Sequence, residues 1–359
     1  MANSNFTVFS SNDIGSPQLD GTSGSLINVL DGCLVNGYGT KVPLGWTKPI
    51  ANSGNTGCWK QPSGSLMTLF VNDSGPTGSA AAGTREAWAT GWESLSSLTG
   101  SLSGTGVGQF PTTLQMSVGI GGLAGFVIPS GSVVWRKSIT ADNTPRYWIL
   151  YGDASTFYLF FINGDTAGTY TGAYSGCFFG DLYSFSQTPD NYKCIISGRV
   201  VLNQAGGTGG RYDPCENLTV GLTDQTWPTF VARSLTNSGG SSTILGRLGD
   251  SSKCVSSLIA TPGGGAGPGL YSFSGTLTCP NPADNSLYMA PITMCDTTNS
   301  SLRGRMRGMY HLAHPAVNFS DGQIIAGSNE YAGKTFQLVK KGPNGGIWAI
   351  EISPTVETN

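Results

Sequence analysis

The chain has only two histidines, and their spacing is the first pattern that could support chemistry. His311 and His314 stand three apart in "HLAHP", which on a helix would place both imidazoles on one face. The strand-like "GRMRGMY" before them and Pro315 after them argue against a helix. No H-E-x-x-H pattern or adjacent carboxylate supplies further ligands. We therefore expect a loop pair with structural hydrogen bonds, and we predict neither a metal nor another cofactor.

Two further patterns touch on catalysis. "SNEYAGKT" (328–335) ends like a phosphate-binding loop, but Ser328 stands where the motif needs glycine, and a strand-like "FQLVKK" follows. We expect a turn that leads into a strand. Four aspartates could supply the acid and base of a glycoside hydrolase if the fold brought two of them together, although aspartate beside glycine is typical of turns: Asp153, Asp165, Asp181 and Asp284. We predict that the protein is not an enzyme.

Three arginines alternate in "RGRMRG". Arg303, Arg305 and Arg307 have the period of two that places side chains on one face of a strand. The functional interpretation is a charged interface to a neighbouring subunit, and the alternative is a solvated edge strand whose charges prevent aggregation. We favour the interface.

Composition indicates a folded, β-rich protein. Charged residues make up 11% of the chain, against about 25% in average proteins. Glycine occurs 53 times in 359 residues, well above the average share of about 7%. "RYWILYGD", "TFYLFFINGD" and similar runs of β-branched and aromatic residues, bounded by turn residues, predict strands. The predicted fold is mainly β, a sandwich or barrel-like body with one N-terminal amphipathic helix and glycine-rich surface loops.

The same composition argues against two classes of partner. The net charge is −2 and basic runs are missing from the sequence, so we expect no nucleic-acid partner. The apolar runs are far shorter than the roughly 20 residues of a membrane-spanning helix, so we expect no membrane partner.

The helix is predicted from Ser25 to Gly37. Ser23 or Ser25 can cap its beginning, and Gly37 stands where a left-handed residue ends a helix. Apolar residues recur at helical spacing, and the β body or a neighbouring subunit must cover them. The candidate interface residues of this helix are Leu26, Ile27, Leu30 and Leu34.

Three regions are expected along the chain. Residues 1–24 are polar and rich in turn residues and predict an extended arm, residues 25–110 a helix with a β region, and residues 111–359 the main β domain. Glycine-rich pieces at 203–211, 237–243 and 261–268 predict surface loops.

Eight cysteines occur without a C-x-x-C pair, so a zinc site of the usual spacing is not expected. The cysteines could be buried thiols, or some could form disulfides if the protein later reaches an oxidising medium, and the sequence leaves both open. The first residues carry no basic and apolar signal, so we expect the chain to be made in a cytoplasm and not to be exported by a signal peptide.

The stretch "GSPQLDGTSGSLINVLDGCLVNGYGTKVPLGWTKP" resembles the N-terminal signature of a widespread group of tailed-bacteriophage virion proteins. Further matching segments follow in order: "FVNDSGP", "TREAWATGWES", "WRKS", "TADNTPRYWILYGDASTFYLF", "FFGDLYSF", "NPADNSLYMAPI", "SSLRGRMRGMYHLAHP" and "AGKTF". These segments contain mostly strand and turn residues and name no catalytic group.

The resemblance implies a structural role in the virion. We expect a homo-oligomeric component of the head surface (a decoration or cement protein) or of the head–tail region, with other virion proteins and copies of itself as partners. A tail or baseplate component is the alternative within this class. A carbohydrate- or receptor-binding module is a second class, with a host surface glycan as partner, and Trp92, Trp135 and Trp348 as candidate platforms.

Overall fold

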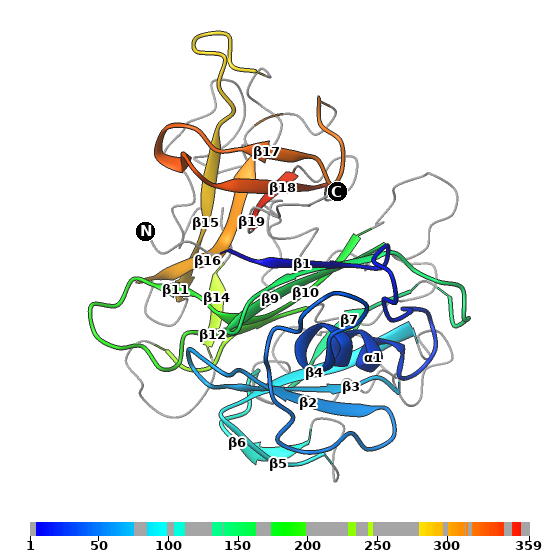
Figure 1. Ribbon diagram of the computed structural model, residues 1–359. Helices are drawn as coiled ribbons and strands as arrows, with labels where there is room; N and C mark the ends of the chain where they lie inside the picture. The colour runs from blue at the N-terminus through cyan, green and yellow to red at the C-terminus, as the bar shows by residue number, and fades with distance from the viewer. Residues whose placement is uncertain are drawn as a thin grey trace, which may run out of the picture.

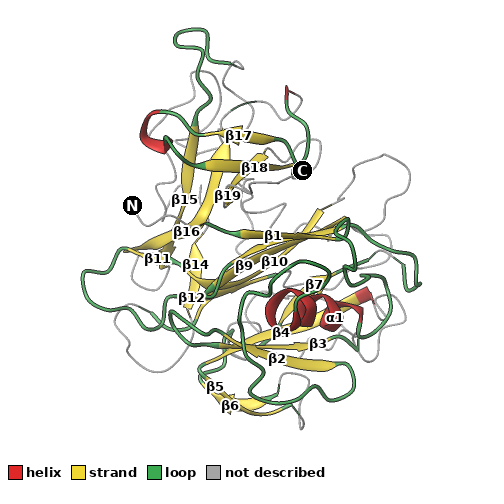
Figure 2. Ribbon diagram, viewed as in Figure 1, coloured by secondary structure: helices red, strands yellow, loops and turns green. Residues whose placement is uncertain are grey.

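Antiparallel strands dominate the computed structural model (Figure 2). It describes residues 5–74, 85–98, 104–111, 131–138, 140–162, 174–198, 229–234, 243–246, 280–296, 301–312, 314, 318–340 and 347–352. The loops expected at 203–211 and 261–268, and residues 237–242 of the third, lie outside these ranges.

The largest sheet has 13 strands, and neighbours in its order are hydrogen-bonded. In that order the strands are β1 (Thr7–Ser10), β8 (Trp148–Gly152), β9 (Thr156–Ile162), β10 (Tyr174–Asp181), β12 (Cys194–Ser197), β13 (Thr229–Val231), β14 (Thr243–Gly246), β15 (Met289–Asp296), β16 (Ser301–Leu312), β19 (Ile347–Ile352), β18 (Thr335–Lys340) and β17 (Ile324–Ala326). The two-residue strand β11 (Tyr183–Ser184) leaves this path and pairs with β16.

Two smaller sheets and the helical segments complete the described fold. One sheet has the order β2 (Thr56–Lys60), β3 (Thr68–Asn72), β4 (Glu86–Trp92) and β7 (Val133–Arg136), and the other pairs β5 (Ser94–Ser97) with β6 (Thr105–Val107). The helical segments are α1 (Ser25–Asp31), its π-helical continuation η1 (Gly32–Asn36) and the 3-10 turn η4 (Asn329–Tyr331).

Strands β8, β9 and β10 are buried on both faces, and the sequences of β8 and β9 are the nearly continuous apolar runs typical of such strands. In β9, Phe157, Leu159 and Phe161 face a core shared with α1 and the four-stranded sheet, while Tyr158 and Phe160 face a second core shared with β15, β16 and β19. This is the alternation that a strand imposes. In Figure 1, β9 and β10 cross the middle of the molecule, with α1 and β2–β4 below them and β15–β19 above. The packed layers confirm the predicted mainly-β, sandwich-like body.

The predicted helix exists, and its apolar stripe lies in the chain's own core. Leu26, Leu30 and Leu34 are fully buried and Ile27 is 4% exposed. Of the two coverings that the sequence left open, the β body is therefore the one observed, and these four residues do not form a contact surface for another subunit.

The ends of the helix differ from the expected caps. Gly24, with φ of +87°, precedes the helix, and the serines on either side of it do not cap it by a side-chain hydrogen bond. The backbone N–H of Leu26 instead donates to Oδ2 of Asp73 at 3.0 Å, and Asp73 is the residue that follows β3. Gly37 follows η1 with φ of +73°, a positive value that favours glycine, as predicted.

The expected division into three regions needs correction. Within residues 1–24, β1 is a strand of the large sheet, because it pairs with β8 along its whole length. A boundary near residue 110 would cut the four-stranded sheet, because β7 pairs with β4. Residues on both sides of the expected boundary thus build one sheet.

Two further expectations concern cysteines and membranes. Four cysteines have described side chains, and all four are buried thiols that form no disulfide: Cys33, Cys58, Cys177 and Cys194. Among the described helices, none has the length and apolar character needed to cross a membrane.

Candidate functional site

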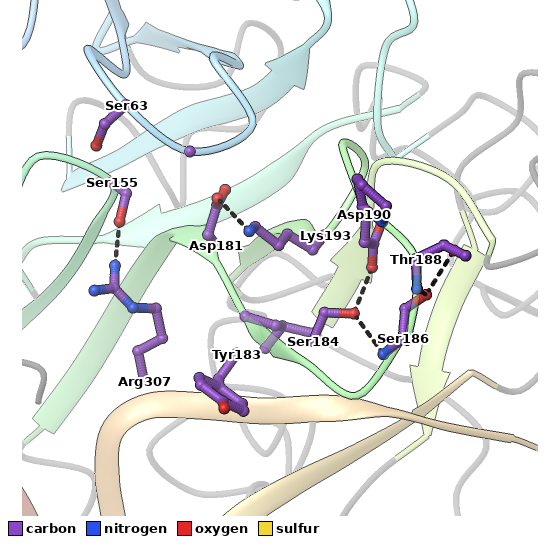
Figure 3. Close-up of a pocket in the computed structure, with 13 residues that line it drawn as sticks. Ser63, Ser155, Asp181, Tyr183, Ser184, Ser186, Thr188, Asp190, Lys193 and Arg307 are labelled. Atoms are coloured by element: carbon purple, nitrogen blue, oxygen red, sulfur yellow. Dashed lines mark hydrogen bonds and ion pairs between the residues drawn. The ribbon is translucent and has the colours of Figure 1, made fainter. Parts of the chain in front are cut away.

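A polar cavity of about 440 Å³ opens where four segments of the chain meet. They are the β2–β3 turn with Ser63 and Gly64, the β8–β9 turn with Ser155, the segment from Asp181 to Lys193 that follows β10, and Arg307 of β16. Figure 3 shows these side chains gathered around one space. Its volume lies in the range of small-molecule sites, which is roughly 300–1,000 Å³.

Asp181, the last residue of β10, is 3% exposed and forms the inner wall of the cavity. Its Oδ2 accepts a hydrogen bond from the backbone N–H of Ser65 at 2.9 Å, and its Oδ1 accepts one from Gln61 Nε2 at 3.1 Å. Lys193 Nζ lies 3.7 Å from Oδ2. Burial raises the pKa of this carboxyl above its ordinary value, against the opposing effects of the hydrogen bonds and of Lys193.

The position of Asp181 depends on a glycine at the turn opposite. Gly64 has φ of +76°, and a Cβ built on it would overlap the Asp181 carboxylate. Glycine is therefore required at this turn both by the backbone conformation and by the close approach of Asp181.

The rim of the cavity is held by ion pairs within the chain. Arg307 binds Asp153 through Nη2–Oδ2 at 2.8 Å and Nη1–Oδ1 at 3.2 Å, and it also donates to Ser155 Oγ. Arg303 Nη2 donates to Asp190 Oδ1 at 2.8 Å, and the other oxygen of Asp190 accepts from Ser184 Oγ at 2.7 Å.

These contacts correct the interface predicted for Arg303, whereas for the partly exposed Arg305 and Arg307 the interface stays a prediction. Arg303 is fully buried, so it cannot touch a neighbouring subunit. The guanidinium of Arg305 lies 4.7 Å from the ring centre of Tyr183, and Arg307 binds Asp153. The "RGRMRG" strand therefore fixes segments 153–156 and 183–190 of its own chain.

A second polar cluster lies in the core. Lys137 Nζ and Asp73 Oδ1 are 2.5 Å apart, and both side chains are fully buried. Lys137 also donates to the carbonyl of Thr22 and to Ser25 Oγ. Burial raises the pKa of Asp73 to about 6, although the Lys137 ammonium opposes this shift. The cluster joins the beginning of α1 to the ends of β3 and β7.

The loop pair expected for the two histidines is observed only in part, because His311 lies within strand β16, opposite Trp348 of β19. His314 is buried, and its Nε2 accepts a hydrogen bond from the backbone N–H of Tyr288 at 2.7 Å, as expected for a structural histidine. Residues 328–335 form the short turn η4 and then enter β18, which confirms the predicted turn and strand.

The structure places the four candidate aspartates differently. Asp153 and Asp181 are both hydrogen-bonded to Ser155: the backbone N–H of Asp181 donates to the Ser155 carbonyl, and the backbone N–H of Ser155 donates to Asp153 Oδ1. Asp284 is an exposed partner of Tyr288 in another part of the chain, and Asp165 lies outside the described residues. The three tryptophans proposed as glycan platforms, Trp92, Trp135 and Trp348, are buried in the core and cannot serve as such.

Sequence reasoning missed Asp190, Lys193 and the hydroxyls of segment 184–188. The polar run "SFSQTPDN" indicates a loop, but only the fold places it beside the β2–β3 turn. Within the described parts of the chain, no group of three His, Cys, Asp or Glu side chains is arranged to hold a metal ion.

Comparison with known proteins adds no further assignment. No protein-family model matches the chain, and a search of curated proteins finds no match.

Proposed function

We propose that this protein is a structural component of a tailed-bacteriophage virion, present in several copies on the head surface or in the head–tail region. The proposal starts from the sequence resemblance, because a β fold by itself carries no function. One observation supports it: the segments that carry the resemblance meet in space, where their polar residues fasten the fold together.

The buried core cluster is the first place where these segments are in contact. Asp73 comes from "FVNDSGP", Lys137 from "WRKS" and Ser25 from "GSLI". Together they cap α1 and anchor it to two strands by the 3.0 Å and 2.5 Å contacts described above. Three separate segments of the resemblance thus serve one structural purpose.

The rim of the cavity is the second place where such segments are in contact. Asp153 comes from "YGDAS", Asp190 follows "FFGDLYSF" closely, and Arg303 and Arg307 come from "RGRMRG". Each arginine side chain is paired with one of these carboxylates of its own chain. Residues used in this way stabilise a scaffold, which suits a protein whose task is to persist in a particle.

The proposed partners are other virion proteins and copies of the same chain, since particle shells and tails repeat their subunits symmetrically. Assembly would take place in the host cytoplasm, and the mature location would be the virion. No catalytic step forms part of the proposal.

The test is mass spectrometry of purified particles that have been disrupted and separated into heads and tails. Enrichment with the heads is the expected result, and enrichment with the tails would replace the head position by the tail or baseplate alternative. Absence from both fractions would overturn the proposal. Deleting residues 1–40 is an unsuitable test, because it removes core residues of α1 and would unfold the chain.

A further inference from the structure

The charges around the polar cavity balance. Asp181 and Asp190 line it together with Lys193 and Arg307. The guanidinium of Arg307 is engaged by Asp153, and Lys193 faces Asp181. An anionic ligand would meet two carboxylates, and a cationic ligand would meet two basic groups, so neither sign of charge is favoured.

Hydroxyl groups supply much of the remaining polar lining. Ser155, Ser184, Ser186 and Thr188 come from two segments, and Ser63 comes from a third. A hydroxyl can both donate and accept hydrogen bonds. A wall of hydroxyls and balanced charges therefore matches a ligand that also presents both donors and acceptors.

The gap between Lys193 and Asp181 offers a specific contact. Their 3.7 Å separation is longer than a hydrogen bond, which is about 2.7–3.2 Å for this kind of pair. A ligand hydroxyl can therefore accept from Lys193 Nζ and donate to Asp181 Oδ2. Hydrogen bonds to charged groups are stronger than those between neutral groups.

Tyr183 is the one aromatic residue among those that line the same cavity. Tyr183 is 39% exposed, and Arg305 lies against its ring. An exposed ring beside a polar wall offers an apolar surface to the C–H groups of a ligand whose edges carry hydroxyls.

We propose that this cavity binds an uncharged saccharide unit, a mono- or disaccharide, through Asp181, Lys193 and the hydroxyls of segment 184–188. This goes beyond a scaffold role, and it does not depend on the location of the protein in a particle. Free sugars and the ends of longer glycans share the chemistry that the cavity would recognise.

The experiment is a titration of the full-length protein with uncharged sugars, followed by saturation-transfer NMR and calorimetry. The probes are glucose, galactose, mannose and N-acetylglucosamine as free sugars, immobilised glycans that end in them, and inorganic phosphate as an anionic comparison. We expect at least one sugar to bind with a dissociation constant in the millimolar range or below, about −4 kcal/mol or better. Binding only to immobilised glycans would assign the site to chain ends, and binding to both would assign it to the single unit.

Two neighbouring substitutions give a matched control. Ser186 lines the cavity and Gln187 is exposed and does not line it, so Ser186→Trp should fill the cavity while Gln187→Trp should not. We expect Ser186→Trp to weaken sugar binding at least tenfold, and Gln187→Trp to leave it within twofold. Lys193→Met, which removes one donor without touching the backbone, provides a second variant and should also weaken binding.

Three results would overturn the proposal. They are the lack of any binding by the sugars and glycans at millimolar concentration, sugar binding that the cavity variants leave unchanged, and phosphate binding that sugar does not displace. Thermal melting of each variant identifies any that fails to fold, and the remaining variant then decides.

Discussion

Lys137→Met provides the sharpest test of how the fold is held together. The side chains of Lys137 and Asp73 are both fully buried and 2.5 Å apart, and Asp73 also caps α1. Methionine approximates the length of lysine without its charge. The substitution leaves the Asp73 carboxylate buried without its ammonium partner.

The size of the effect follows from the burial of the pair. Breaking a buried ion pair by removing one partner costs about 3–5 kcal/mol. With an unfolding entropy of roughly 2.1 cal/mol/K per residue, a 359-residue chain that unfolds as one unit would lose about 4–7 °C in Tm.

The assay is urea unfolding and thermal melting of the wild-type protein, Lys137→Met and the double variant Asp73→Asn/Lys137→Met. The double variant should be more stable than Lys137→Met alone, because asparagine removes the buried charge and its side-chain oxygen can still cap α1. Lys340→Met, at a partly exposed lysine, is the control. A loss below about 1 kcal/mol for Lys137→Met, the range of exposed pairs, would show that the ion pair is not buried as described.

Three further predictions concern the core. Leu30→Ala should lower the free energy of unfolding by about 2–5 kcal/mol, because Leu30 is fully buried. Asn28→Ala, on the exposed side of the same helix, should change that free energy by less than about 0.5 kcal/mol. Equal effects of the two substitutions in urea unfolding would contradict the assigned packing. Gly91→Ala should cost about 1–3 kcal/mol by overpacking, because its Cβ would overlap the Phe110 ring, and unchanged stability would contradict the contact. Because the pKa of Asp73 is raised in the folded state, that state keeps the Asp73 proton to higher pH than the unfolded state does. The stability of the wild type relative to Asp73→Asn should therefore fall as pH rises from about 4 to about 6. A rise in relative stability over that window would mean that folding lowers the pKa of Asp73 instead.

Local sequence patterns carried much of the fold. The apolar runs "WILY" and "TFYLFFI" predicted strands and became β8 and β9, because a strand buried on both faces needs a continuous apolar sequence. The apolar spacing of the helix predicted α1, but the same spacing could not say which surface would cover it. Most of "TREAWATGWES" forms strand β4, which pairs on both edges.

The candidate site could not be predicted in the same way. Asp181, Ser63 and Arg307 are far apart in sequence, and only the order of the strands brings them together. The alternation of the arginines was visible, but their ion pairs with Asp153 and Asp190 depend on two distant turns. The spacing of charges along one strand therefore suggested an interface, whereas Arg303 and Arg307 form ion pairs within the chain.

The most direct test of the virion proposal is the copy number of this chain in intact, gradient-purified particles, measured by quantitative mass spectrometry against the major capsid protein. The infected-cell lysate serves as the reference for unassembled protein. We expect the chain to stay with the particles in a constant, multiple copy number through repeated purification. Abundant chain in the lysate with none in the particles would contradict it.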